Sequence, residues 1–303
     1  MRNEILNISK LLLDGNNSDA MQIVDNLIEL KSNDLKASSH QSWFTLLTRF
    51  KSFLNDHING VIDNDYVLPF NVFKVGNKKL PFINYSTIPL TNCVGASECK
   101  KYCYSLNSMR FPLASLSWLQ NQILETHYFN IIDREFSMII SKAKFKKQLA
   151  KQGHIDFRLY NDGDFSTIEN MMKWFNLLKK YPSIKCYGYT KSLNLIRTLT
   201  LLDYEFPNNY RFNVSNGGKY DNLGQSTIIK ENPCYRGNFI AYNLNDKRHK
   251  TSHGISKDEI KTIRNDFDKK VFICPLVCDT CTSKGHACGS DNFKNLDIVI
   301  PIH

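Results

Sequence analysis

Cysteine is the residue of this chain best suited to chemistry, because seven of its nine cysteines lie in two tight clusters. The first cluster consists of Cys93, Cys99 and Cys103, with five residues between the first two thiols and three between the last two. Thiolates are soft ligands that suit iron-sulfur clusters, zinc or copper(I). Structural zinc sites and electron-transfer clusters usually take four protein ligands, so three thiols predict a metal centre with one position open for chemistry.

Four further cysteines lie close together near the C-terminus. They make a complete ligand set for an auxiliary [4Fe-4S] cluster or a four-thiolate zinc site. Only one pair has the two-residue spacing of a zinc knuckle, and Pro275 lies beside a ligand, so we favour iron-sulfur over zinc. The four are Cys274, Cys278, Cys281 and Cys288.

Other arrangements of the second cluster stay open. His286 could replace one cysteine as a ligand, or it could be a solvent-facing loop residue. The spacing from Cys274 to Cys281 also suits a catalytic loop, although few residues follow it. Thiols of both clusters could share one metal site.

The two remaining cysteines are isolated. Cys186 lies in an apolar, strand-like segment and is predicted to pack in the core. Cys234 follows Asn232 and Pro233 in a loop-like segment, where it is either an ordinary loop residue, a ligand at the rim of the site or a reactive thiol. An odd number of cysteines argues against a closed disulfide framework.

The hydrophobic pattern predicts helices followed by alternating strands and helices. Residues 1–65 show apolar residues at helical spacing, and residues 66–90 form short extended runs around a turn at Gly76. Strand, helix, strand, helix predicts an α/β fold, a partial (β/α) barrel with parallel strands. Helices are expected over 115–152, 166–180 (with Ser166 and Glu169 as a capping box) and from 193, and strands over 81–90, 154–161, 184–190 and 210–215. The rhythm weakens after Gly217 and Gly218, where 226–230, 238–243, 270–274 and 296–302 could supply further strands.

Three regions follow from this pattern. Residues 1–65 form an N-terminal helical extension, residues 66–265 form the partial barrel with the three-cysteine loop, and residues 266–303 form the cysteine-rich auxiliary segment with the last strand. The first cysteine cluster directly follows the candidate first strand. We therefore expect it at the C-terminal ends of the strands, where barrels of this kind carry their active sites.

Several residues beside the cysteines strengthen this placement. Tyr102 immediately precedes the last cysteine of the first loop, Gly163 and Asp164 follow the second strand, and Ser215 and Asn216 end the fourth. This arrangement resembles the radical S-adenosylmethionine superfamily, although both cysteine intervals are longer than its usual three and two residues. The alternative interpretation of Gly163 and Asp164 is an ordinary strand-to-helix turn rich in Asp and Gly.

The resemblance implies a mechanism and roles for these residues. A [4Fe-4S] cluster on the three cysteines would chelate S-adenosylmethionine, and its reductive cleavage would start radical chemistry on an unidentified substrate, with a reductant protein as partner. Gly163 and Asp164 would bind the methionine amino group, and Ser215 and Asn216 the ribose. Lys191, which follows the third strand, would meet the cofactor carboxylate or an anionic substrate unless it is a surface lysine.

A second resemblance covers more of the chain. The loop Cys-x-Gly-Ala-Ser-x-Cys-x3-Cys-Tyr, the later Arg-Leu-Tyr-x-x-Gly-Asp-Phe and the Tyr-Thr-Lys-Ser segment are similar to the gene product 88 family, over roughly residues 70–290. That family implies a phage or mobile-element setting. It implies no particular reaction.

Composition limits the partners. The net charge of +10 and basic runs at 142–151 and 246–250 favour anionic partners such as nucleic acid, or are simply solvated lysine-rich surfaces. A non-catalytic, metal-stabilised nucleic-acid-binding protein is therefore the competing hypothesis. No apolar run approaches the roughly 20 residues of a membrane span, and the N-terminus lacks a signal-peptide core, which predicts a cytoplasmic protein.

Overall fold

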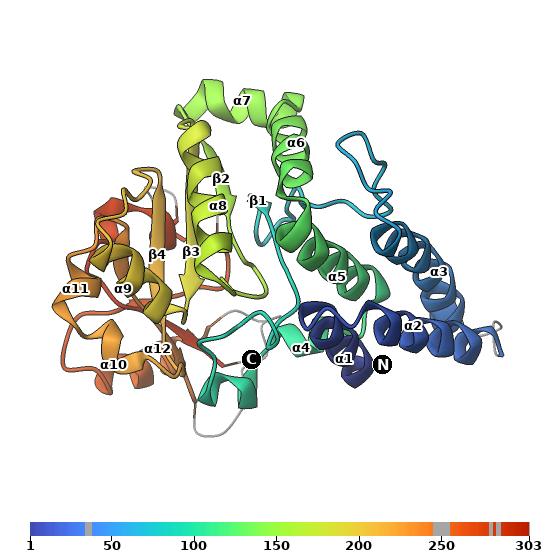
Figure 1. Ribbon diagram of the computed structural model, residues 1–303. Helices are drawn as coiled ribbons and strands as arrows, with labels where there is room; N and C mark the ends of the chain where they lie inside the picture. Colours follow the sequence, from blue (N-terminus) through green and yellow to red (C-terminus); the bar gives the residue numbers. More distant parts are fainter. Residues whose placement is uncertain (34–37, 245–254, 279–280, 283–285, 303) are drawn as a thin grey trace.

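Seven parallel strands form one curled, open sheet, a half-barrel that carries helices on its outer side (Figure 1). The computed structural model describes residues 1–33, 38–244, 255–278, 281–282 and 286–302. The order across the sheet is β1-β2-β3-β4-β5-β7-β6. The predicted α/β partial barrel is confirmed. The strands are β1 (Ile83–Asn84), β2 (Ile155–Arg158), β3 (Ile184–Thr190), β4 (Tyr210–Ser215), β5 (Tyr235–Tyr242), β6 (Phe272–Ile273) and β7 (Ile298–Pro301).

The first strand is much shorter than predicted. Pro81 and Pro89 flank it and cannot donate backbone hydrogen bonds, so the ladder is regular only over β1. The predicted turn at Gly76 is present, with φ of +81°, and an isolated antiparallel bridge joins Lys74 to Asn84. The second strand also ends early, because Tyr160 has a positive φ of 54°.

The predicted strand over residues 226–230 is wrong. This segment forms the short helix α11 (Thr227–Lys230), which packs between α9 and β5 and buries Ile229. Its β-branched residues favour strands, but packing against neighbouring elements decided the conformation.

One predicted long helix is three helices in the structure. Tyr128 and Lys142 have non-helical backbone angles and separate α5, α6 and α7. The predicted cap of α8 is also wrong, because Thr167, and not Ser166, accepts the hydrogen bond from the Asn170 amide at 3.1 Å. The helices of the barrel are α4 (Ser105–Ser108), α5 (Pro112–His127), α6 (Phe129–Ile140), α7 (Ala143–Gln152), α8 (Ile168–Lys180), α9 (Leu193–Leu201), α10 (Asp221–Gly224) and α12 (Lys257–Asn265), with 3-10 turns η1 (Glu98–Tyr102), η3 (Ala287–Gly289) and η4 (Asp291–Phe293).

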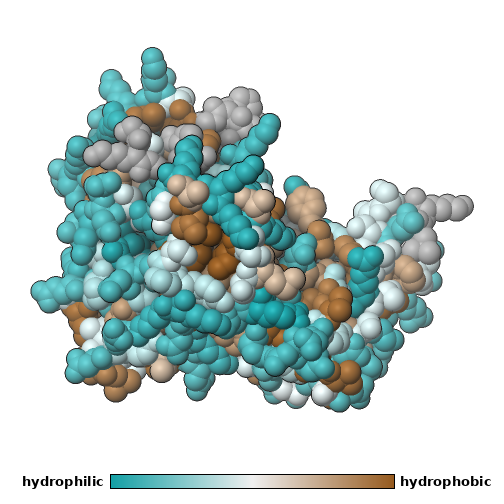
Figure 2. Space-filling view, turned by 90° about the horizontal axis from the view of Figure 1, so that it is seen from above, coloured by the Kyte–Doolittle hydropathy of each residue, from teal (hydrophilic) through white to brown (hydrophobic). Residues whose placement is uncertain are grey.

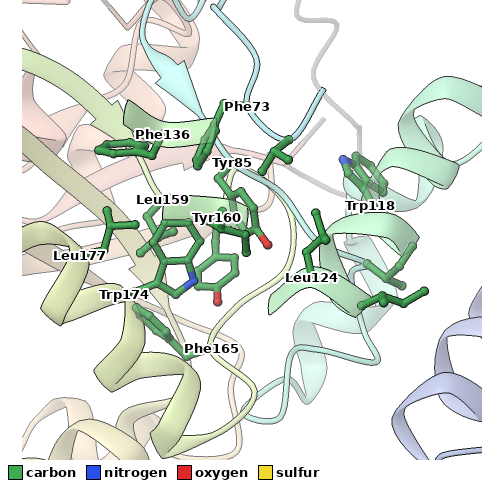
Figure 3. Packing of buried hydrophobic residues seen from close by; sticks show 14 of the residues in the cluster. Phe73, Tyr85, Trp118, Leu124, Phe136, Leu159, Tyr160, Phe165, Trp174 and Leu177 are labelled. Atoms are coloured by element: carbon green, nitrogen blue, oxygen red, sulfur yellow. The ribbon is translucent and has the colours of Figure 1, made fainter. Parts of the chain in front are cut away.

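The N-terminal helical region is confirmed, and it shares the main hydrophobic core with the barrel. Helices α1 and α3 pack against α5, and Ser9 and Gln122 exchange two hydrogen bonds of 2.5 and 2.8 Å. An aromatic group centred on Trp174 fills the space between β2 and the outer helices (Figure 3). The N-terminal helices are α1 (Arg2–Leu13), α2 (Asn17–Ser32) and α3 (Ser38–Ile58).

The surface agrees with the basic composition. Helix α7 buries Phe145 and exposes its lysines. The run at 246–250 lies outside the described residues. On the face shown in Figure 2, hydrophilic side chains predominate and apolar side chains form smaller groups between them. Within the described part of the chain, no helix is both long and apolar enough to cross a membrane.

Candidate active site

A cavity of about 470 Å³ lies at the carboxyl ends of the strands, and both cysteine clusters line it. The sequence analysis favoured a separate auxiliary site for the second cluster, whereas the structure places all seven thiols around one space. The roles of these residues stay predictions, but the residues are gathered in one place. The predicted site residues on its wall are Cys93, Cys99, Tyr102, Cys103, Gly163, Asp164, Ser215, Asn216, Cys274, Cys278, Cys281 and Cys288.

The three-cysteine loop is fixed against the end of β4. The backbone amides of Ser97 and Cys99 donate to the Gly217 carbonyl at 3.2 and 3.0 Å, and Lys219 donates to Gly95 at 2.7 Å. Gly217 has φ of +82°, and a Cβ there would lie 2.5 Å from the Tyr102 hydroxyl. This role of the glycine pair was not predicted, although two glycines shortly after a strand at the predicted rim were a usable signal.

The turn after β2 packs tightly against the loop that follows β1. Gly163 has φ of +85°, and a Cβ on it would lie 2.2 Å from the Thr87 hydroxyl oxygen. Asp164 is buried; one carboxylate oxygen accepts from the Phe165 amide and the other from the Lys191 amide, both at 2.8 Å. Burial raises the pKa of Asp164, while these amides and the Lys191 charge oppose that rise. A side-chain hydrogen bond from Thr190 also lowers the pKa of Asp164.

The strand ends beyond β2 are joined by polar side chains. The Lys191 ammonium donates to the Ser215 hydroxyl at 2.6 Å, so this lysine belongs to the cavity wall rather than to the open surface. Asn216 accepts from the Ala241 amide at 2.8 Å and thereby links β4 to β5. A ligand that binds Ser215 would therefore share it with a cation.

The C-terminal cysteine segment lies on the inner face of the half-barrel. His286 is buried: its Nε2 lies 3.2 Å from Asp156, and its Nδ1 accepts from the Gly289 amide at 3.1 Å. Since both ring nitrogens are engaged, His286 neither faces solvent nor is free to bind a metal. The ring also contacts Phe82 and Tyr187, with centroids 4.8 and 4.6 Å away.

The thiols suit a soft metal in chemical type, but they do not form a finished site. Burial raises the pKa of Cys93 and Cys103, and brings that of Cys274 to about 12 and of Cys288 to about 11, so these groups would ionise on binding a metal. Among the described residues, no three Cys, His, Asp or Glu side chains are close enough to hold a metal ion as placed. Metal binding would therefore require the sulfur atoms to move together, and a metal-binding C-terminal segment stays a prediction.

The two isolated cysteines lie away from the cavity. Cys186 is fully buried in β3, as predicted. Cys234 is also buried, its thiol donates to the Pro207 carbonyl at 3.3 Å, and burial raises its pKa to about 12. The interpretation of Cys234 as a rim ligand is therefore wrong, and a neutral, enclosed thiol is a poor nucleophile.

One cavity residue was overlooked in the sequence. Arg158, the last residue of β2, lines the cavity beside Tyr187 and Tyr189. A charged residue between the apolar Phe157 and Leu159 was the available signal. Such a residue must reach either solvent or a polar site.

The fold and cavity define an α/β half-barrel protein with a cysteine-lined site at the carboxyl ends of its strands. The model of the family described as gene product 88 matches residues 70–290, which is most of the chain. The protein therefore belongs to the gene product 88 family. Neither the curated proteins nor the solved structures contain a match.

Proposed function

We propose that this protein is an iron-sulfur protein that resembles radical S-adenosylmethionine enzymes. The observation that supports this most is that the three-cysteine loop after β1 and the Gly163–Asp164 turn after β2 share one cavity. A [4Fe-4S] cluster held there, with one iron free of protein ligands, would supply the electron for reductive cleavage of S-adenosylmethionine. A reductant protein would provide that electron. The protein would act in the cytoplasm of a bacterial host, and its gene would be carried by a phage or plasmid.

The residues of the chain would bind and orient the cofactor. Cys93, Cys99 and Cys103 would hold the cluster. The backbone at Gly163 can approach a ligand closely, because no side chain intervenes, and the Asp164 carboxylate suits an ammonium group. Ser215 and Asn216 offer a hydroxyl and an amide to the ribose, and Tyr102 closes the loop against Gly217. The finer roles follow from the resemblance stated above.

The second cysteine cluster would hold an auxiliary [4Fe-4S] cluster, with zinc as the alternative. Its four thiols lie on the same cavity wall, so an auxiliary centre would stand near the substrate. Because the His286 nitrogens are both engaged, the ligand set would be the four cysteines alone.

The experiment is anaerobic purification followed by iron, sulfide and zinc analysis. We expect a brown protein that loses about one cluster in the Cys93→Ala/Cys99→Ala/Cys103→Ala variant. Cys186→Ala is the matched control, because this thiol is buried away from the cavity and its loss should leave the iron content unchanged. Addition of S-adenosylmethionine should change the electron paramagnetic resonance signal of the reduced protein.

The competing function is a metal-stabilised, nucleic-acid-binding protein. The net charge of +10 and the exposed lysines of α7 favour it. A colourless protein with stoichiometric zinc, and with DNA or RNA binding that weakens steeply with salt, would establish this alternative and refute the first proposal.

A further inference from the structure

The guanidinium of Arg158 lies inside the cavity. Arg158 pairs with Asn84 of β1 and Tyr187 of β3 in the sheet. Side chains alternate along a strand, so Arg158 shares a face with Asp156, which contacts His286 on the inner side of the half-barrel. The side chain therefore points toward the inner face, where it contributes to the cavity wall.

The surroundings of this guanidinium contain aromatic rings but no compensating carboxylate. Its Cζ lies 4.8 Å from the centroid of the Tyr189 ring. Burial lowers the pKa of Arg158, but Tyr189, Tyr104, Tyr187 and Cys278 together raise it well above its ordinary value. Among the described residues no carboxylate forms an ion pair with Arg158, and its buried Nε has no hydrogen-bond partner.

Other arginines of this protein are treated differently. The fully buried Arg236 donates to Asn213 at 2.6 Å and to the carbonyls of Phe293 and Asn238, both at 3.1 Å. Arg211 binds both carboxylate oxygens of Asp291, at 2.5 and 3.0 Å. Where the fold uses a guanidinium structurally, the chain provides its acceptors. Arg158 lacks them.

Neither acidic residue described on the cavity wall forms an ion pair with Arg158, and the second carboxylate oxygen of Asp162 is buried without a hydrogen-bond partner. One oxygen of Asp162 accepts from Ser86 and Asn161, at 3.0 and 2.9 Å, and the nearby Lys74 opposes its charge. Asp164 accepts from two backbone amides. Because arginine stays protonated at all physiological pH values, a half-buried positive charge remains in the cavity, and it has no ion-pair partner among the described residues.

We propose that the cavity binds a small molecule through a carboxylate or phosphate group that Arg158 receives. Burying a charge is unfavourable unless it is paired, and an anionic ligand would pair this one. A guanidinium can bind a carboxylate or a phosphate group through two parallel hydrogen bonds. The Tyr189 ring stabilises the Arg158 guanidinium from one side by a cation–π contact. Phe239 and Ile300, also on the wall, would contact the apolar part of the ligand. This inference concerns an anionic ligand and does not depend on a metal in the cavity.

The test is equilibrium binding of two simple anions to the full-length purified protein. Inorganic pyrophosphate and succinate are titrated separately by calorimetry, so that the phosphate and carboxylate forms of the proposal are distinguished. We expect at least one of them to bind, and Arg158→Gln to weaken that binding about tenfold or more, since hydrogen bonds between charged groups are the strong ones. Arg158→Lys should retain part of the affinity.

The control is Arg211→Gln, which removes the same charge outside the cavity and should leave the affinity unchanged. Circular dichroism verifies that each variant is folded. If Arg158→Gln is not folded, the affinity of Arg158→Lys is compared with that of the wild type instead. Absence of binding by both anions would overturn the proposal. Equal affinity of wild type and Arg158→Gln for the anion would also overturn it. The same holds if Lys191→Gln, tested in parallel, loses affinity while Arg158→Gln does not, because the guanidinium would then act on the thiols or the fold and not on a ligand.

Discussion

A buried carboxyl group in the core should make the stability of this protein fall as pH rises. Glu125 on α5 is 1% exposed, and its Oε1 accepts hydrogen bonds from the Tyr160 hydroxyl at 2.5 Å and the Trp174 indole at 2.6 Å. Burial raises its pKa from 4.5 to about 7, although these hydrogen bonds and Lys173 oppose the rise. The folded protein therefore holds this proton more tightly than the unfolded chain does.

The sign and size of the effect follow from linkage. Below pH 4.5 both states are protonated and Glu125 has no effect on stability. As pH rises from 4.5 to 7, Glu125 ionises in the unfolded state first. Ionisation lowers the free energy of the unfolded state, whereas the folded state stays protonated and is not stabilised. At 1.36 kcal/mol per pKa unit, the loss of unfolding free energy reaches about 3 kcal/mol above pH 7.

Chemical denaturation of the wild type and Glu125→Gln between pH 4.5 and 8 measures this effect. Glutamine keeps an oxygen to accept from Tyr160 and Trp174 but cannot ionise. We expect the variant to gain about 3 kcal/mol relative to wild type across this range. Glu231→Gln is the control, because Glu231 is exposed and its substitution should leave the pH profile unchanged. A constant difference between wild type and Glu125→Gln at all pH values would refute the reasoning.

Three further predictions concern the cavity. Gly217→Ala should lower the unfolding free energy by about 1–3 kcal/mol, because the new Cβ meets Tyr102 and φ is positive. Gly60→Ala has a similar φ but open space around the new Cβ, so it should lower the unfolding free energy less. Equal losses in chemical denaturation would contradict the proposed packing of the loop. His286→Phe should destabilise the protein more at pH 7 than at pH 3. Burial raises the pKa of Asp156, but the hydrogen bond with His286 helps to lower it below its ordinary value, and the resulting stabilisation is lost when Asp156 is protonated. A denaturation midpoint shifted equally at both pH values would count against this prediction. In metal-free native protein, iodoacetamide should label the six half-buried cavity cysteines faster than the buried Cys186, Cys234 and Cys288, as mass spectrometry would show. Labelling of all nine at one rate would contradict the described burial. The six are Cys93, Cys99, Cys103, Cys274, Cys278 and Cys281.

The sequence pattern was informative wherever local periodicity and burial agree. The strands at Ile184–Thr190 and Tyr210–Ser215 have the predicted bounds, and the N-terminal region is helical as predicted. The pattern failed where contacts from elsewhere decide. Tyr160 takes a positive φ that ends β2, and its hydroxyl binds Glu125 on another element, a contact that no local spacing encodes.

The candidate site shows the same division. Residue type and order along the chain placed the three-cysteine loop, the Gly163–Asp164 turn and the Ser215–Asn216 pair at strand ends, because parallel strands bring their carboxyl ends to one edge. The sequence by itself therefore determined which residues could do chemistry and on which edge of the sheet they lie. Only the tertiary structure decided that both cysteine clusters face one cavity and that Asp156 contacts His286, because these contacts join segments more than a hundred residues apart. It also decided that, among the described residues, no carboxylate pairs with Arg158, because that depends on which side chains the fold brings close to the guanidinium.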